Sequence, residues 1–144
     1  MIRVTRRYRF SASHRLHAPA LGDAENRELY GKCNNPFGHG HNYDLEVSVS
    51  GPVDGRSGRA VDIPLLDELV RRQVIEPFDH ANLNEQVEAF RAVVPTSENL
   101  GREVIKRLKQ NWHAVFPGEW PLLEKVCIAE TSRNIFEVFP HEIE

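Results

Sequence analysis

The stretch from residue 38 to residue 51, G-H-G-H-N-Y-D-L-E-V-S-V-S-G, decides the fold class of this chain. From residue 43 to residue 50 apolar and polar residues alternate strictly, with Tyr43, Leu45, Val47 and Val49 at the apolar positions. Such alternation is typical of a strand in an antiparallel sheet that buries one of its faces. Gly51-Pro52 predicts the end of this strand.

Two histidines, His39 and His41, stand directly before the alternation. Side chains at positions i and i+2 of an extended chain point to the same side, so both imidazoles can reach one metal ion. The glycines on either side of His39 leave its backbone free to adjust. An H-x-H pair on its own is nevertheless more often a pair of ordinary surface or core histidines than a pair of ligands.

A first strand is predicted over residues 2–14, where apolar residues also recur with a period of two. His14 ends this strand and shares the parity of Phe10 and Ala12. If the two strands pair antiparallel, His14 lies beside His39 and His41 at one end of the sheet. Three neutral imidazoles suit Zn²⁺ and leave a fourth position for water or substrate. The sequence therefore predicts a three-histidine zinc site.

The rest of the chain predicts two helices and two short strands. One helix begins near Pro64 and ends at Pro77, and a second follows Thr96 as its N-cap. Short apolar runs at 122–131 and 135–139 read as strands joined by a turn. The order ββααββ indicates an α+β fold, a four-stranded antiparallel sheet with two main helices on one face. The two edges of such a sheet must be covered, blunted or paired with other subunits.

Length and composition indicate a single domain over residues 1–144, and we expect it to be soluble and cytoplasmic. The net charge of −3 favours neither nucleic acid nor an anionic membrane as a partner. No secretory signal or bilayer-spanning run is expected. The two cysteines, Cys33 and Cys127, are far apart and favour free thiols in a reducing compartment.

Cys33 lies in a long polar stretch between the first two strands, beside Lys32. A stretch of this length in a small domain is usually functional or disordered. A neighbouring cation lowers the pKa of a thiol, which favours a reactive thiolate. Two other readings stay open, an inert structural cysteine and a fourth zinc ligand that closes the site. We assign Cys127, inside a strand pattern, to the core.

Two further carboxylates, Asp79 and Glu130, lie at positions that can serve a function. Asp79-His80 can act in proton transfer, although an exposed pair in a turn is the simpler interpretation. Glu130 ends an apolar run, where a carboxylate needs a partner such as the paired N–H groups of a guanidine-like ring edge. The alternative for Glu130 is the solvated end of a strand.

Five motifs in order give a resemblance over nearly the whole chain. They are F-S-A-S-H at 10–14, G-K-C-N-N-P-F-G-H-G-H-N-Y at 31–43, F-D-H-A-N-L-N at 78–84, P-T-S-E-N at 95–99 and A-E-T at 129–131. Together they resemble the 6-pyruvoyltetrahydropterin synthase family. The family's tunnelling fold implies a barrel closed by oligomerisation, in a homohexamer made of two stacked trimers with active sites at the subunit interfaces.

The resemblance implies a role for each candidate residue. The implied zinc ligands are His14, His39 and His41. The implied catalytic residues are Cys33 as the base, with Asp79 and His80 as a relay from a neighbouring subunit. Glu130 would anchor the 2-amino-4-oxo edge of the pterin, and Thr96 and Glu98 would line the same pocket.

The implied activity is that of a carbon–oxygen lyase in tetrahydrobiopterin biosynthesis. It converts 7,8-dihydroneopterin triphosphate to 6-pyruvoyltetrahydropterin and releases triphosphate. The alternative is the related 6-carboxytetrahydropterin synthase of queuosine biosynthesis, which also yields acetaldehyde. Its cysteine usually lies closer to the H-G-H motif, whereas here five residues separate Cys33 from His39, the spacing of pyruvoyl-forming enzymes. A third type of enzyme in this family, which has glutamate in place of the cysteine, is excluded by Cys33. A more distant alternative is a zinc-stabilised interaction module without catalytic activity.

Overall fold

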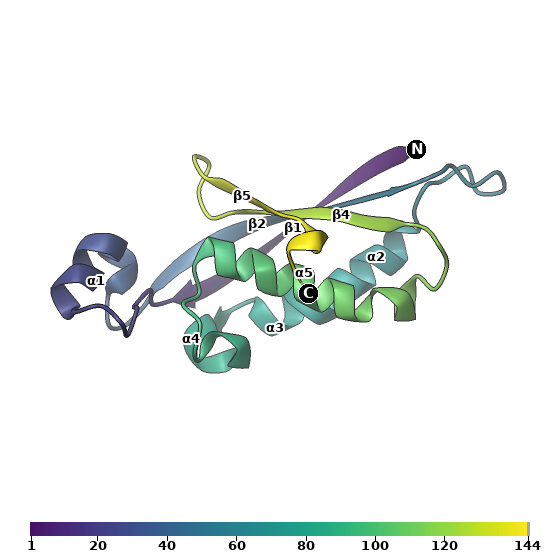
Figure 1. Cartoon of the computed structure of the whole chain (residues 1–144). Helices are drawn as coiled ribbons and strands as arrows, with labels where there is room; N and C mark the ends of the chain where they lie inside the picture. The colour runs from purple at the N-terminus through teal and green to yellow at the C-terminus, as the bar shows by residue number, and fades with distance from the viewer. Residues whose placement is uncertain (144) are drawn as a thin grey trace.

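The computed structural model describes residues 1–143 as one sheet with helices on one of its faces (Figure 1). The strands are β1 (Ile2–His14), β2 (His39–Gly51), β3 (Ala81–Asn82), β4 (Leu122–Ala129) and β5 (Ile135–Val138). The helices are α1 (Asp23–Tyr30), α2 (Ile63–Val70), α3 (Glu76–Phe78), α4 (Leu83–Gln86) and α5 (Ser97–Val115). The order of strands across the sheet is β3-β1-β2-β4-β5. The predicted α+β class is confirmed.

Strands β1 and β2 pair antiparallel along their whole length, as expected. The register runs from Ile2 opposite Gly51 to His14 opposite His39. The end of β1 therefore lies beside the start of β2. Strand β4 pairs with the other edge of β2, with Asp44 opposite Ala129, so the end of β4 reaches the same region of the sheet.

The predicted four-stranded antiparallel sheet is incomplete, because β3 adds a fifth strand that runs parallel to β1. Its two residues pair as Ala12 with Ala81 and Ser13 with Asn82. A strand of two residues is too short to show alternating apolar and polar residues, so the sequence pattern did not predict β3. The long polar stretch before His39 likewise contains α1, whose only buried residue is Asn26, so it has no apolar stripe.

The two predicted helices begin where their caps place them. The Asp62 side chain accepts a hydrogen bond from Leu65 N at the start of α2, and the Thr96 hydroxyl accepts one from Asn99 N at the start of α5. The first predicted helix ends at Phe78, one residue after the predicted stop at Pro77. It is not a uniform α-helix, because α2 continues through a π-turn at Arg71–Ile75 into α3.

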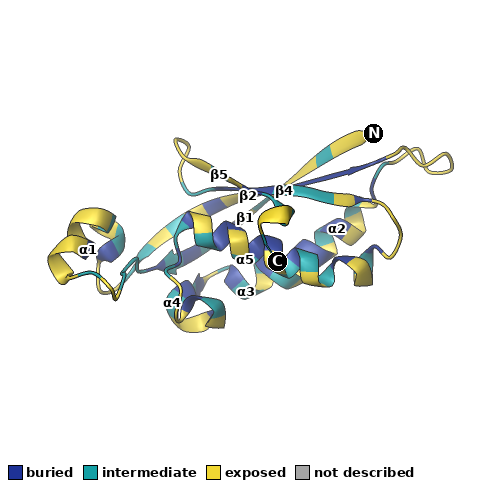
Figure 2. Cartoon of the chain, in the orientation of Figure 1, coloured by how far each residue is buried: buried dark blue, intermediate teal, exposed yellow. Residues whose placement is uncertain are grey.

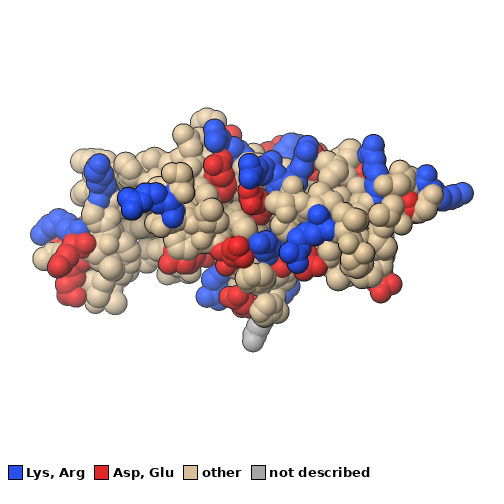
Figure 3. Space-filling model, turned by 90° about the horizontal axis from the view of Figure 1, so that it is seen from above, with Lys and Arg blue, Asp and Glu red and all other residues tan. Residues whose placement is uncertain are grey.

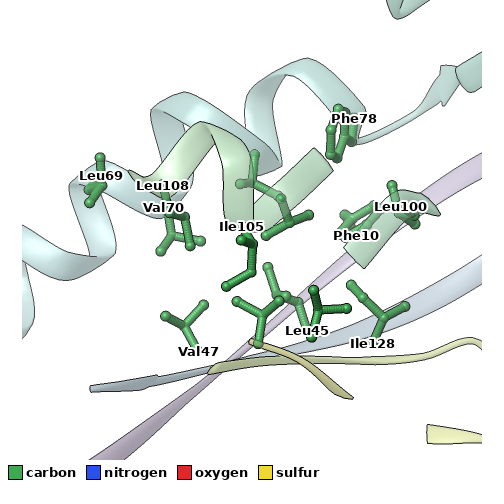
Figure 4. Close-up of a cluster of buried hydrophobic side chains, with 14 of the residues drawn as sticks. Phe10, Leu45, Val47, Leu69, Val70, Phe78, Leu100, Ile105, Leu108 and Ile128 are labelled. Carbon is green, nitrogen blue, oxygen red and sulfur yellow. The ribbon is translucent and has the colours of Figure 1, made fainter. Parts of the chain in front are cut away.

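The core lies between the sheet and helices α2, α3 and α5. Figure 4 shows apolar side chains of both layers meeting there, including Phe10, Leu45, Phe78 and Ile105. The other face of the sheet is charged, with Arg7 paired to Glu46 at 2.7 Å and Arg9 to Asp44 at 2.9 Å. Helix α1 stands apart at the end of the sheet and is largely exposed (Figure 2). Within residues 1–143 no helix combines the length and apolar character that a membrane crossing requires.

Candidate metal centre and active site

Four potential metal donors meet where β1 ends, β2 begins and β4 ends. They are the ring nitrogens of His14 and His41, the Cys33 sulfur and a Glu130 oxygen, all within 4.8 Å of one another. Glu130 Oε1 lies 2.7 Å from His41 Nε2, and Cys33 Sγ lies 3.5 Å from the same nitrogen. Nitrogen, sulfur and carboxylate oxygen are the donors that Zn²⁺ takes in proteins.

His14 is fully buried, and its two ring nitrogens have different surroundings. Nδ1 lies 2.9 Å from the carbonyl oxygen of Pro95, and a carbonyl only accepts, so Nδ1 carries the proton. Nε2 is thereby an unprotonated acceptor, and it has no hydrogen-bond partner among residues 1–143. Burial lowers the pKa of His14, which keeps the ring neutral. A buried lone pair without a partner, aimed at three other donors, fits a metal ligand.

His39 lies at the margin of this cluster. It pairs directly with His14 across the two strands, and its ring centroid is 4.6 Å from that of His41. It does not belong to the four groups whose donor atoms lie within 4.8 Å of one another. The parity expected from the sequence nevertheless holds, because His14, His39 and His41 form one row on one side of the sheet.

Cys33 is held against the chain that follows His14. Its carbonyl accepts a hydrogen bond from Leu16 N at 2.7 Å, and the buried Asn34 side chain donates to Leu16 O at 2.8 Å. The expectation that Lys32 lowers the pKa of the thiol is wrong. Burial, with the Glu130 carboxylate as the second cause, raises the pKa of Cys33.

Glu130 is oriented by a residue that sequence reasoning missed. The Ser97 hydroxyl donates to Glu130 Oε2 at 2.8 Å, and Ser97 is only 3% exposed. The Thr96 hydroxyl caps α5 by accepting a hydrogen bond from Asn99 N, and Glu98 is exposed. In the sequence, only the position of Ser97 within the P-T-S-E-N motif indicated a functional role. A serine at the start of a helix is otherwise assigned to the helix cap.

Asp79 and His80 lie beside β3, at the edge of the sheet. Asp79 accepts a hydrogen bond from Ser11 N at 2.9 Å and contacts His80 Nδ1 at 3.1 Å. The His80 side chain is 83% exposed, and its φ of 59° is left-handed. Within the described chain neither residue is hydrogen-bonded or ion-paired to the four-donor cluster. His80 and His41 border the same open groove of about 360 Å³.

The sheet with helices on one face and the donor cluster at its end define a tunnelling-fold domain with a candidate metal-binding site. The family described as 6-pyruvoyl tetrahydropterin synthase matches residues 3–141, and the chain belongs to this family.

Individual relatives agree with this assignment. The 6-pyruvoyl tetrahydrobiopterin synthase of Drosophila melanogaster is 43% identical over 132 residues, which cover 92% of this chain and 76% of that protein. The structure of the Caenorhabditis elegans 6-pyruvoyl tetrahydropterin synthase superposes with a TM-score of 0.86 at 41% identity, covering 96% of this chain and 94% of that one. The 6-carboxy-5,6,7,8-tetrahydropterin synthase of Rickettsia conorii is 33% identical over 86 residues, 60% of this chain and 54% of that protein.

Proposed function

We propose that this protein is a zinc-dependent lyase that converts 7,8-dihydroneopterin triphosphate to 6-pyruvoyltetrahydropterin and releases triphosphate. The observation that carries the proposal is the unpartnered Nε2 of buried His14, which faces a second histidine, a thiol and a carboxylate. Family membership and the names of the most similar relatives support the same reaction.

In this proposal His14, His39 and His41 hold the zinc ion. Their common side of the sheet and the 4.6–4.7 Å between neighbouring ring centroids support this assignment. Zinc supplies Lewis acidity, which lowers the pKa of the hydroxyls on the substrate side chain and of the adjacent C–H group. The carbonyl of Pro95 keeps His14 in the tautomer that presents Nε2 to the metal.

The remaining residues handle protons and orientation. Cys33, whose sulfur lies 3.5 Å from His41 Nε2, takes the proton from the substrate side-chain carbon. Asp79 and His80 of a neighbouring subunit return a proton, and the His80 exposure at the sheet edge supports delivery between subunits. The ring gains the hydrogen that the side chain loses, so no redox cofactor is required.

The Glu130 carboxylate accepts the paired N–H groups of the pterin's 2-amino-4-oxo edge. Its hydrogen bond from Ser97 supports this role because it fixes the orientation of the carboxylate. Thr96 and Glu98 belong to the same pocket in this proposal, Thr96 through the cap that sets the start of α5.

The active molecule in this proposal is a homohexamer. The edge of β1 from residue 2 to residue 11 has no strand beside it within the described chain, since β3 covers only Ala12 and Ser13. An open edge of this length invites pairing with another copy. Trimers that close a barrel in this way, stacked in pairs, place the active sites at subunit interfaces.

A product assay on the zinc-loaded protein tests the proposal. Dihydroneopterin triphosphate should yield free triphosphate and 6-pyruvoyltetrahydropterin, both identified by mass spectrometry. Acetaldehyde with 6-carboxytetrahydropterin would instead establish the alternative reaction, in line with the partial similarity to the Rickettsia conorii enzyme. Absence of triphosphate release would leave a zinc-stabilised interaction module, which should unfold when the metal is chelated.

A cysteine variant tests whether Cys33 acts as the catalytic base or as a zinc ligand. Cys33→Ala should retain zinc and lose turnover, whereas loss of zinc would make Cys33 a ligand and the site a closed one. Cys127→Ala is the matched control, because Cys127 is buried on β4 outside the four-donor cluster. It should retain both zinc and turnover.

A further inference from the structure

The turn that carries Cys33 has little packing of its own to hold it in place. It is a single 3-10 turn, Gly31–Asn34, and within residues 1–143 the hydrophobic core includes none of its four residues. The preceding helix, α1, lies at the end of the sheet, apart from the helices over the core (Figure 1). Figure 3 shows acidic and basic side chains together on the surface at this end of the molecule. The position of Cys33 therefore depends on contacts outside α1 and the turn.

Residues 15–17, directly after His14, supply those contacts. Leu16 N donates to the Cys33 carbonyl at 2.7 Å, and Asn34 Nδ2 donates to the Leu16 carbonyl at 2.8 Å. These two bonds satisfy both backbone polar groups of Leu16. Within residues 1–143, Asn34 is the one residue of the turn whose side chain hydrogen-bonds to this segment.

The amide of Asn34 suits this role because both of its N–H groups have partners. The Leu16 carbonyl only accepts, so the nitrogen of the amide must face it. The second N–H points to His17 Nδ1 at 3.1 Å, which accepts it and therefore carries no proton. Asn34 is only 5% exposed, so little water reaches these bonds. A buried donor with two partners holds the turn in one position.

The segment that receives these bonds is itself held in place. The Asn84 side chain accepts a hydrogen bond from Arg15 N at 2.7 Å and donates one to Arg15 O at 2.9 Å. His14, the preceding residue, is fully buried at the end of β1. Asn34 thus connects the turn that carries Cys33 to a firmly held segment beside the metal site.

We propose that Asn34 is a positioning residue for Cys33 and sets where the sulfur lies relative to the metal site. This proposal rests on the proposed function, in which Cys33 is the base. Cys33 and Asn34 are neighbours in one turn, so a shift of the Asn34 backbone moves the sulfur, which lies 3.5 Å from His41 Nε2. A displacement of about 1 Å at a catalytic group can cost about 100-fold in rate.

Kinetics of the zinc-loaded protein test the positioning role. Asn34→Asp keeps the size of the side chain but has no donor for the Leu16 carbonyl, so kcat should fall about 100-fold. KM and zinc content should stay near wild type, since within residues 1–143 Asn34 is hydrogen-bonded to no proposed ligand of zinc or pterin. Asn35→Asp adds the same charge at the next, exposed position and keeps the acceptor for Phe37 N, so it should show wild-type kcat.

Alkylation of the two cysteines by iodoacetamide gives a second readout that does not need turnover. In Asn34→Ala, which introduces no charge, Cys33 of the zinc-loaded protein should react severalfold faster than in the wild type at the same pH, because the freed turn exposes its sulfur. Cys127, buried on β4, should react at the wild-type rate in the same sample. Asn35→Ala is the matched control and should leave both rates unchanged.

The outcomes separate this proposal from the proposed function. Wild-type kcat in Asn34→Asp, or an equal loss in Asn35→Asp, overturns the positioning role. Loss of zinc from Asn34→Asp overturns it as well, because Asn34 would then support the metal site rather than the base. In Asn34→Ala an unchanged rate at Cys33, or an equal rise at Cys127, has the same consequence. If the wild type shows no turnover while Cys33 alone reacts faster in Asn34→Ala, the link between Asn34 and Cys33 stands and the proposed function fails.

Discussion

The Nδ1 atom of His14 and the carbonyl oxygen of Pro95 lie 2.9 Å apart, although 81 positions separate the two residues in the chain. This contact joins the end of β1 to the segment that leads into α5. It determines the tautomer of a fully buried histidine and leaves Nε2 available to a metal. The chemistry of the site therefore depends on how α5 is placed on the sheet.

Substitution of His14 should remove the metal. Outer-shell partners of zinc ligands typically contribute 10–100-fold to metal affinity, so we expect His14→Ala, which removes a ligand, to lower zinc affinity by at least about 100-fold. Metal content after dialysis against a weak chelator measures the effect. His113→Ala, at an exposed position near the end of α5, is the control and should keep its zinc. Full zinc content in His14→Ala would contradict the ligand assignment.

The reactivity of Cys33 should depend on pH and on Glu130. In metal-free protein, burial and the Glu130 carboxylate raise the pKa of the Cys33 thiol. The thiolate is therefore scarce near pH 7, and its fraction increases as the pH rises toward the pKa. Glu130→Gln removes the negative charge and should lower this pKa, which makes alkylation by iodoacetamide faster near pH 7. Mass spectrometry of the labelled peptide follows the rate at Cys33. Glu119→Gln, in an exposed loop, should leave the pH profile unchanged, and an unchanged profile in Glu130→Gln would refute the coupling.

Ser97 should contribute to substrate binding through Glu130. Ser97→Ala removes the hydrogen bond to Glu130 Oε2 and should raise KM about tenfold, since a hydrogen bond to a charged group contributes roughly 1.5–3 kcal/mol. Steady-state kinetics and zinc content together measure the effect, and zinc content should not change. Ser132→Ala, in the exposed turn after β4, should show wild-type kinetics. Wild-type KM in Ser97→Ala would show that Glu130 does not need this partner.

Gly101 should be required for the packing of α5 against β5. A Cβ at this position would lie 2.7 Å from Val138 Cγ2, which is closer than real contacts allow. Alanine favours a helix interior by up to about 1 kcal/mol over glycine, but overpacking typically costs about 1–3 kcal/mol. Gly101→Ala should therefore destabilise the protein by up to about 2 kcal/mol, measured by urea unfolding. Adding Val138→Ala should recover part of this loss, and simple additivity of the two changes would argue against a steric clash.

Much of the fold was predictable because its signals are local. Alternation with a period of two placed β1 and β2 and put His14, His39 and His41 on one side of the sheet. Caps and prolines located the starts of α2 and α5. Strand β3 and helix α1 escaped prediction because one is two residues long and the other buries a single side chain.

The sequence by itself determined the α+β class, the positions of the first two strands and the common side of His14, His39 and His41, since each follows from local patterns along the chain. Only the tertiary structure decided which groups act on one another. It brought Glu130 to His41, Ser97 to Glu130 and the Pro95 carbonyl to His14. It also reversed the expected direction of the Cys33 pKa, because burial and a carboxylate distant in sequence raise it. These contacts arise when β4 pairs with β2 and when α5 packs on the sheet, and no local pattern encodes them.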